Sequence, residues 1–159
     1  MFHWLFPRRR AGAASSERFG PYAIQRTIHE GEKALVFEAV SQVDGRRVAI
    51  KTYKPLYDRT ARRMRKKYGL PSEGEIGLMM NPGPADDPVA FPVVRTLHHG
   101  HEYGRPSNPH YVVMEYVDGA KLKSLIAVRD ARLRAMRLHF CRRGARALEI
   151  IHARRMIHR

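Results

Sequence analysis

Cysteine and acidic residues are the scarce components of this chain. Cys141 is the only cysteine among 159 residues, which excludes a disulfide within the chain and suits a reducing, cytoplasmic location. The 15 aspartates and glutamates are outnumbered by 30 lysines and arginines, so the formal net charge is +15 at pH 7. No apolar run approaches the roughly 20 residues that cross a bilayer. We therefore expect no transmembrane segment.

The excess positive charge lies in two blocks. Residues 59–67 hold six basic side chains, and residues 129–159 hold ten arginines against Asp130 and Glu149. Such surfaces attract phosphate groups, but a nucleic-acid groove would also need interleaved aromatic side chains or a known binding module. The sequence has neither, so nucleic acid is not an expected partner. Solvated helix faces are the favoured interpretation, and contact with acidic groups outside this chain is the alternative.

Three segments differ in character. A composition of 43% hydrophobic and 28% charged residues fits one globular domain. Residues 1–18 form a basic, then small and polar, leader that we expect to be flexible. Residues 19–117 carry the strand patterns, and residues 118–159 are predicted to be mainly helical.

The strand patterns predict a five-stranded antiparallel sheet. Tyr22, Ile24 and Ile28 fall at even spacings, as in a half-buried strand. Asp44-Gly45 is a strong hairpin turn between the next two strands. The predicted strands are residues 22–28, 34–40, 47–53, 93–97 and 111–115.

Helical patterns follow the third strand and close the chain. Residues 58–68 and 73–80 are predicted helices, separated by Gly69 and Pro71. Beyond Gly119 the pattern is helical again. The last helix carries an i, i+3, i+4 stripe of apolar and small residues, namely Leu133, Met136, Phe140, Gly144, Ala147, Leu148 and Ile151. The predicted fold class is α+β.

Two early motifs carry candidate chemistry. The first hairpin, residues 28–36, holds Gly31 in its turn and Val36 shortly after it. A single glycine in a turn is ordinary and indicates little alone. Twenty residues beyond Gly31, the third strand contains Val48-Ala49-Ile50-Lys51. A small Ala49 beside Val36 leaves a flat apolar slot, with Lys51 at its edge.

Two later motifs follow in order. Residues 110–122 read as a strand containing Met114, followed by a polar segment with Asp118-Gly119 and a helix start. Taken locally, an edge strand and a glycine turn explain this pattern equally well. The chain then closes on a helix, a basic turn and Met-Ile-His158-Arg159.

Taken together, residues 22–159 resemble the N-terminal lobe (N-lobe) and first C-terminal-lobe (C-lobe) helices of a protein kinase domain, most of all the eukaryotic-type serine/threonine kinases of bacteria. In that family a G-x-G-x-x-G-x-V loop covers the ATP phosphates. Here Gly31 and Val36 match, whereas His29 and Ala34 replace the other two glycines. His158-Arg159 matches the start of the catalytic loop, in which the base aspartate would be the next residue.

The resemblance implies a site for ATP. Lys51 would reach the α- and β-phosphates, held by a helix glutamate. Glu75 is the favoured partner and Glu73 its rival, and both also fit plain surface glutamates. Met114 would be the gatekeeper, and Glu115 to Val117 the hinge that binds adenine through its backbone. The implied adenine and phosphate contacts are Ile28, Gly31, Val36, Ala49, Lys51, Met114, Glu115 and Val117.

The implied activity is transfer of the ATP γ-phosphate, with Mg²⁺, to a protein Ser or Thr hydroxyl. No metal ligand is expected in these residues, because the family's magnesium ligands and base follow the His-Arg pair. We therefore expect the 159-residue chain alone to be inactive. Two alternatives stay open. One is a kinase-like binding module or pseudokinase without turnover, and a less favoured one is a basic nucleic-acid-binding protein.

Overall fold

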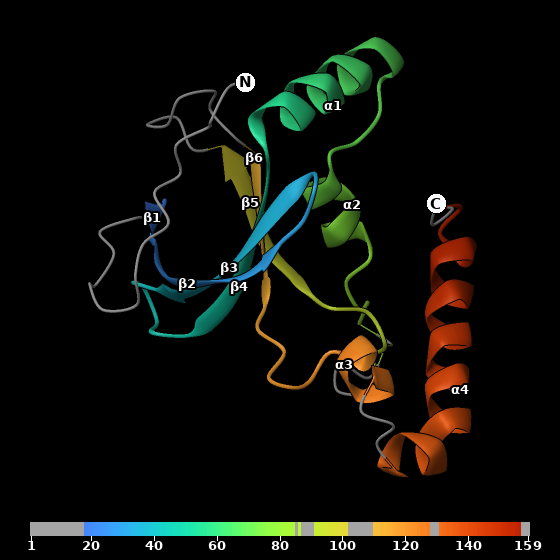
Figure 1. Cartoon of the computed structure of the whole chain (residues 1–159). Coiled ribbons are helices and arrows are strands. Elements are labelled where there is room, and N and C mark those ends of the chain that lie inside the picture. The colour runs from blue at the N-terminus through green and yellow to red at the C-terminus, as the bar shows by residue number, and fades with distance from the viewer. Residues whose placement is uncertain (1–17, 85, 87–90, 102–109, 128–130, 157–159) are drawn as a thin grey trace.

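A curled antiparallel sheet with helices on one side dominates the computed structural model (Figure 1), which describes residues 18–84, 86, 91–101, 110–127 and 131–156. Within these residues the strand order is β1-β2-β3-β4-β6-β5. The strands are β1 (Arg18–Phe19), β2 (Tyr22–Glu30), β3 (Ala34–Ser41), β4 (Arg47–Tyr53), β5 (Thr96–His101) and β6 (His110–Glu115). The α+β class and the antiparallel sheet are confirmed.

One face of the sheet forms the hydrophobic core. Alternate residues of a strand point to opposite faces, and the register pairs Phe37 with Ile50 and Ile50 with Val113. These three side chains are buried. The core cluster comprises Phe19, Ile24, Leu35, Phe37, Ala39, Val48, Ile50, Tyr111 and Val113. All apolar side chains of β3 that point to this face belong to the core. The opposite face of β3 and β4 lies outside the core and can carry a binding site.

The short strand β1 closes the core and was not predicted. It pairs with the start of β2, Arg18 opposite Ala23 and Phe19 opposite Tyr22. The Phe19 ring is 1% exposed, and its centroid lies 5.9 Å from that of Phe37 and 5.5 Å from that of Tyr111. The remainder of the predicted leader, residues 1–17, lies outside the described residues.

Two helices follow β4. Helix α1 (Pro55–Tyr68) begins three residues before the predicted start at residue 58, because Pro55 suits the first helical position. It ends at Gly69, whose φ of 62° provides the left-handed cap. Helix α2 (Glu73–Met79) starts with a capping box between Ser72 and Glu75.

Helix α2 packs on β5 and β6, on the face opposite the core. Its two glycines make the approach possible. A Cβ atom at Gly74 would lie 2.3 Å from the Cβ of His99, and one at Gly77 would lie 2.2 Å from Oγ1 of Thr96. Glycine by itself weakens a helix, and the close packing explains why both positions lack a side chain.

The strand predicted at residues 93–97 is displaced. Strand β5 spans Thr96–His101, so most of it lies in the histidine-rich segment, which lacks the β-branched residues on which the prediction relied. Tertiary pairing with β6 overrides local preference there.

The C-terminal helices are α3 (Leu122–Ala127) and α4 (Ala131–Ala153). Figure 1 shows α4 standing apart from the sheet. Much of its predicted apolar stripe is exposed, including Met136, Phe140 and Leu148. The predicted catalytic-loop residues His158 and Arg159 lie outside the described residues, which end at Met156.

Candidate nucleotide-binding site

Lys51 and Glu73 form the central ion pair of the candidate site. The Nζ atom of Lys51 lies 2.5 Å from Oε1 of Glu73. Lys51 stands on β4, on the face away from the core, and Glu73 is the first residue of α2. The side chains are 29% and 35% exposed, so the pair is partly shielded and open to a ligand. A lysine held at a strand by a helix carboxylate is positioned to contact phosphate oxygens.

Glu75, the favoured partner of Lys51 in the sequence, occupies a different place. Its carboxylate accepts a hydrogen bond from the backbone N of Ser72 at 2.6 Å, while its own backbone N donates to Ser72 Oγ. The backbone N–H of Ser72, and then its side chain, hold the pKa of the Glu75 carboxyl below its usual value. The structure therefore corrects the expectation. Glu73 meets Lys51, because two residues along a helix turn Glu75 to another side.

Tyr53 completes the site and was not predicted from the sequence. Its hydroxyl donates a short hydrogen bond to Oε2 of Glu73, and the Lys51 ammonium lies 5.3 Å from its ring centroid. Burial, then the hydrogen bond to Glu73, raises the pKa of Tyr53 well above its ordinary value. The available signal was the alternation Lys51-Thr52-Tyr53, which puts both side chains on one face of β4.

The predicted adenine slot maps to this same face. Val36 pairs with Lys51 across β3 and β4, and Ala49 pairs with Met114 across β4 and β6. Ala49 is 9% exposed, and its side chain is smaller than those of its strand partners. The strand register thus places Val36, Ala49, Lys51 and Met114 on neighbouring strands of one sheet face.

The turn of the first hairpin, between β2 and β3, lies within the segment predicted to be the phosphate loop. The backbone N of Gly31 donates to the carbonyl of Ala34 at 2.9 Å, which closes the turn between β2 and β3. Ile28 falls in an irregularity of the pairing between Thr27 and His29. Lys121, ahead of α3, donates to the Ile28 carbonyl at 3.4 Å. This exposed contact links the segment after β6 to the first hairpin.

The predicted hinge is anchored at its first residue. Glu115 ends β6 and accepts a hydrogen bond from the backbone N of Arg95 at 2.9 Å, while its own backbone N donates to the Arg95 carbonyl at 3.0 Å. Val117 is 64% exposed. Val117 thus lies in an exposed part of the segment between β6 and α3.

A charged cluster beside the hinge was also not predicted. Glu38 of β3 is 9% exposed and pairs with Arg26 at 2.7 Å and Arg47 at 3.1 Å. The Arg47 guanidinium lies 4.1 Å from the Tyr116 ring centroid and 3.4 Å from the Asp118 carboxylate. The cluster ties the middle of the sheet to the hinge. Its residues are far apart in sequence, which is why no local pattern indicated it.

The described residues hold no group of three or more His, Cys, Asp or Glu side chains arranged to bind a metal ion. Across the same residues, no helix combines the length and apolar character needed to span a membrane.

No protein-family model matches the chain. Curated relatives nevertheless exist. The chain is 31% identical over 146 residues to the serine/threonine-protein kinase PknA of Mycobacterium tuberculosis, covering 88% of this chain and 30% of PknA. It is 27% identical over 143 residues to the serine/threonine-protein kinase PknD of the same species, covering 89% of this chain and 19% of PknD. The chain thus spans less than a third of the length of these relatives.

Solved structures show the same fold. The crystal structure of the Mycobacterium tuberculosis PknI kinase domain superposes with a TM-score of 0.61 at 20% identity, over 93% of this chain and 54% of that one. The structure of Rad53 1-466 in complex with AMP-PNP gives a TM-score of 0.63 at 20% identity, over 87% of this chain and 32% of that one. Sequence and fold agree. The chain is a relative of the bacterial serine/threonine protein kinases and has the fold of the N-lobe and first C-lobe helices of their kinase domain.

Proposed function

We propose that this chain forms the ATP-binding portion of a serine/threonine protein kinase. The observation that carries the proposal is the ion pair between Lys51 and Glu73, on the sheet face that also carries Val36, Ala49 and Met114. In phosphoryl transfer by kinases, such a pair positions the α- and β-phosphates, and catalysis consists mostly of positioning and charge stabilisation.

Each side of the slot has a defined task in this proposal. Val36, Ala49 and Met114 enclose the adenine ring, while backbone groups between Glu115 and Val117 form its hydrogen bonds. Lys51 binds phosphate oxygens, and Glu73 with Tyr53 holds the lysine in place. The paired register of β3, β4 and β6 supports the enclosure, because it puts these side chains on one face.

Mg²⁺ is the second cofactor implied by the kinase family. It would neutralise charge on the ATP phosphates during transfer to a Ser or Thr hydroxyl of a protein substrate. The described residues do not supply a ligand set for it. By the kinase resemblance, its ligands and the base are expected in the C-lobe of a complete kinase domain, and we propose that phosphoryl transfer requires those residues.

Nucleotide binding by the 159-residue chain tests the proposal directly. We expect ATP to bind weakly but saturably in isothermal titration calorimetry, because His29 and Ala34 replace two loop glycines. Lys51→Met should weaken ATP binding at least fivefold and leave adenosine binding nearly unchanged. The matched control Lys123→Met removes an equal charge from exposed α3 and should change neither. Equal loss in both variants would attribute ATP binding to net charge and refute the site.

A kinase-like module without turnover is the second candidate. The two missing loop glycines favour it, since phosphates can approach the backbone less closely at side-chain-bearing positions. A kinase assay on a form extended through the C-lobe distinguishes the candidates. Phosphorylation of a Ser/Thr substrate supports the enzyme, and ATP binding without transfer supports the module.

A further inference from the structure

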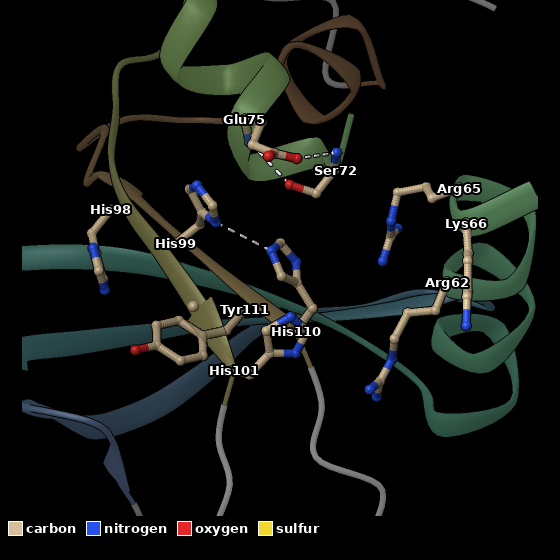
Figure 2. A pocket seen from close by; sticks show the side chains of 11 residues that line it. Arg62, Arg65, Lys66, Ser72, Glu75, His98, His99, His101, His110 and Tyr111 are labelled. Carbon is tan, nitrogen blue, oxygen red and sulfur yellow. Dashed lines mark hydrogen bonds between the residues drawn. The ribbon is translucent and has the colours of Figure 1, made fainter. Parts of the chain in front are cut away.

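A cavity lies between α1, the start of α2 and strands β5 and β6, and neither Lys51 nor Glu73 lines it. Its volume is about 700 Å³. Figure 2 shows its two walls, with basic side chains of α1 on one side and histidines of β5 and β6 on the other. The residues that carry the argument are Arg62, Arg65, Lys66, His99, His101 and His110.

The wall formed by α1 carries uncompensated positive charge. Arg62 is forked onto the buried Asp58, with Nε at 2.8 Å from Oδ2, so its charge is largely balanced. Within the described stretches of the chain, Arg65 and Lys66 form no side-chain ion pair. Of the described residues, Glu75 is the one carboxylate that lines the cavity, and it is already bound to Ser72. The cavity is therefore set up to attract an anion.

The opposite wall contains a buried ring nitrogen without a hydrogen-bond partner. The His110 side chain belongs to a residue only 2% exposed, and its Nδ1 atom is buried without a hydrogen-bond partner. Its Nε2 atom lies 3.4 Å from Nδ1 of His99. Buried polar atoms are nearly always paired, so this ring nitrogen is the group of the histidine wall that is left for a ligand oxygen.

We propose that this cavity binds a phosphate monoester dianion. Arg65 and Lys66 supply two charges that match the two charges of the ligand, and a phosphate has three terminal oxygens that can accept several hydrogen bonds at once. A carboxylate carries one charge and would leave one cation unmatched beside Glu75. The site is separate from the proposed ATP site and does not depend on it.

One of the two proton arrangements that the histidine pair allows suits this complex. When His99 Nδ1 donates to His110 Nε2, the neutral His110 ring carries its proton on Nδ1. Nδ1–H is then a donor for a phosphate oxygen. Burial, then the charges of His101 and His99, lowers the pKa of His110 to about 4, so the ring is neutral at physiological pH.

Phenyl phosphate is the probe for the test, titrated into the 159-residue chain and followed by calorimetry and by the NMR signals of the histidine rings. We expect saturable binding that shifts the His110 signal. The double variant Arg65→Gln, Lys66→Gln should weaken it at least tenfold. The control Arg63→Gln, Lys67→Gln removes the same charge from the same helix outside the cavity, and should weaken it less than twofold. Circular dichroism verifies that both variants fold.

Three outcomes would overturn the proposal. They are equal losses in the two double variants, benzoate binding as tightly as phenyl phosphate, and loss of phenyl phosphate binding in Lys51→Met. The last would show that the probe reports the proposed ATP site.

Two further probes identify the source of the phosphate. Tighter binding of a phosphoserine peptide than of inorganic phosphate supports a protein-borne phosphate, and the reverse order supports a free phosphate or small ester.

Discussion

The Tyr53 hydroxyl and Lys51 ammonium bind opposite oxygens of the same Glu73 carboxylate. Lys51 contacts Oε1 and Tyr53 donates to Oε2. The carboxylate is therefore fixed from two sides by residues of one strand, although it belongs to a helix. Substitutions of these three residues can therefore test how α2 is held against β4.

Tyr53→Phe should loosen Glu73 without removing the ion pair. The ring is retained, so packing is largely preserved, and only the hydroxyl is lost. We expect ATP affinity to fall two- to fivefold, less than in Lys51→Met, because Glu73 gains freedom to turn away from Lys51. Calorimetry on the two variants and their combination checks this. If the fold-loss of ATP affinity in the double variant equals the product of the two single fold-losses, Tyr53 acts independently of Lys51.

Substitutions should show that the two glutamates of α2 have different roles, Glu73 in ATP binding and Glu75 in stability. Glu73→Gln removes the charge that holds Lys51 and should weaken ATP binding while changing thermal stability little, since partly exposed pairs contribute less than about 1 kcal/mol. Ser72→Ala removes the cap that Glu75 shares and should lower the free energy of unfolding by about 1 kcal/mol. Thermal melts and ATP titrations of Glu73→Gln and Ser72→Ala give the comparison. A third variant, Glu75→Gln, is the control for ATP binding. If it weakened ATP binding as much as Glu73→Gln does, the assignment of Glu73 as the lysine partner would be contradicted.

Stability should fall as the solution is acidified because of His110. Its pKa is about 4 in the folded chain, compared with about 6.5 for an unperturbed histidine. The unfolded state binds a proton between these values that the folded state does not, so stability present above pH 6.5 is lost as pH falls toward 4. The expected loss is roughly 3 kcal/mol at most. Urea titrations at pH 7 and 5 should show a smaller difference in His110→Gln than in the unmodified chain.

The exposed face of α4 should cause self-association despite the high net charge. Met136, Phe140 and Leu148 are 45%, 39% and 47% exposed and lie at helical spacing. Apolar surface of this kind favours association. Replacing the three with glutamine should shift sedimentation toward the monomer. Val43→Gln alters a residue that is 82% exposed in a hairpin turn and serves as the control. A monomeric unmodified chain would refute the expectation.

Local patterns predicted the site wherever one strand or one hairpin carried the information. The alternation in β3 and β4 placed Val36, Ala49 and Lys51 on a common face, and the capping pattern of Ser72 was readable in principle. The partner of Lys51 could not be chosen from spacing, since Glu73 and Glu75 differ only by a rotation that the packing of α2 decides. Strand β1 and the cluster around Glu38 depend on contacts between distant segments, for which a single sequence offers no signal.

The close contact of α2 with β5 through Gly74 and Gly77 has a mechanical consequence. A side chain at either position would meet His99 or Thr96, so the helix cannot slide along the strand by one residue without a collision. Alanine would raise intrinsic helix propensity by about 1 kcal/mol, and yet it would push the helix off the sheet. The two glycines therefore fix the position of α2 along β5. By setting how closely α2 approaches β5, they also help to set how far Glu73 stands from Lys51.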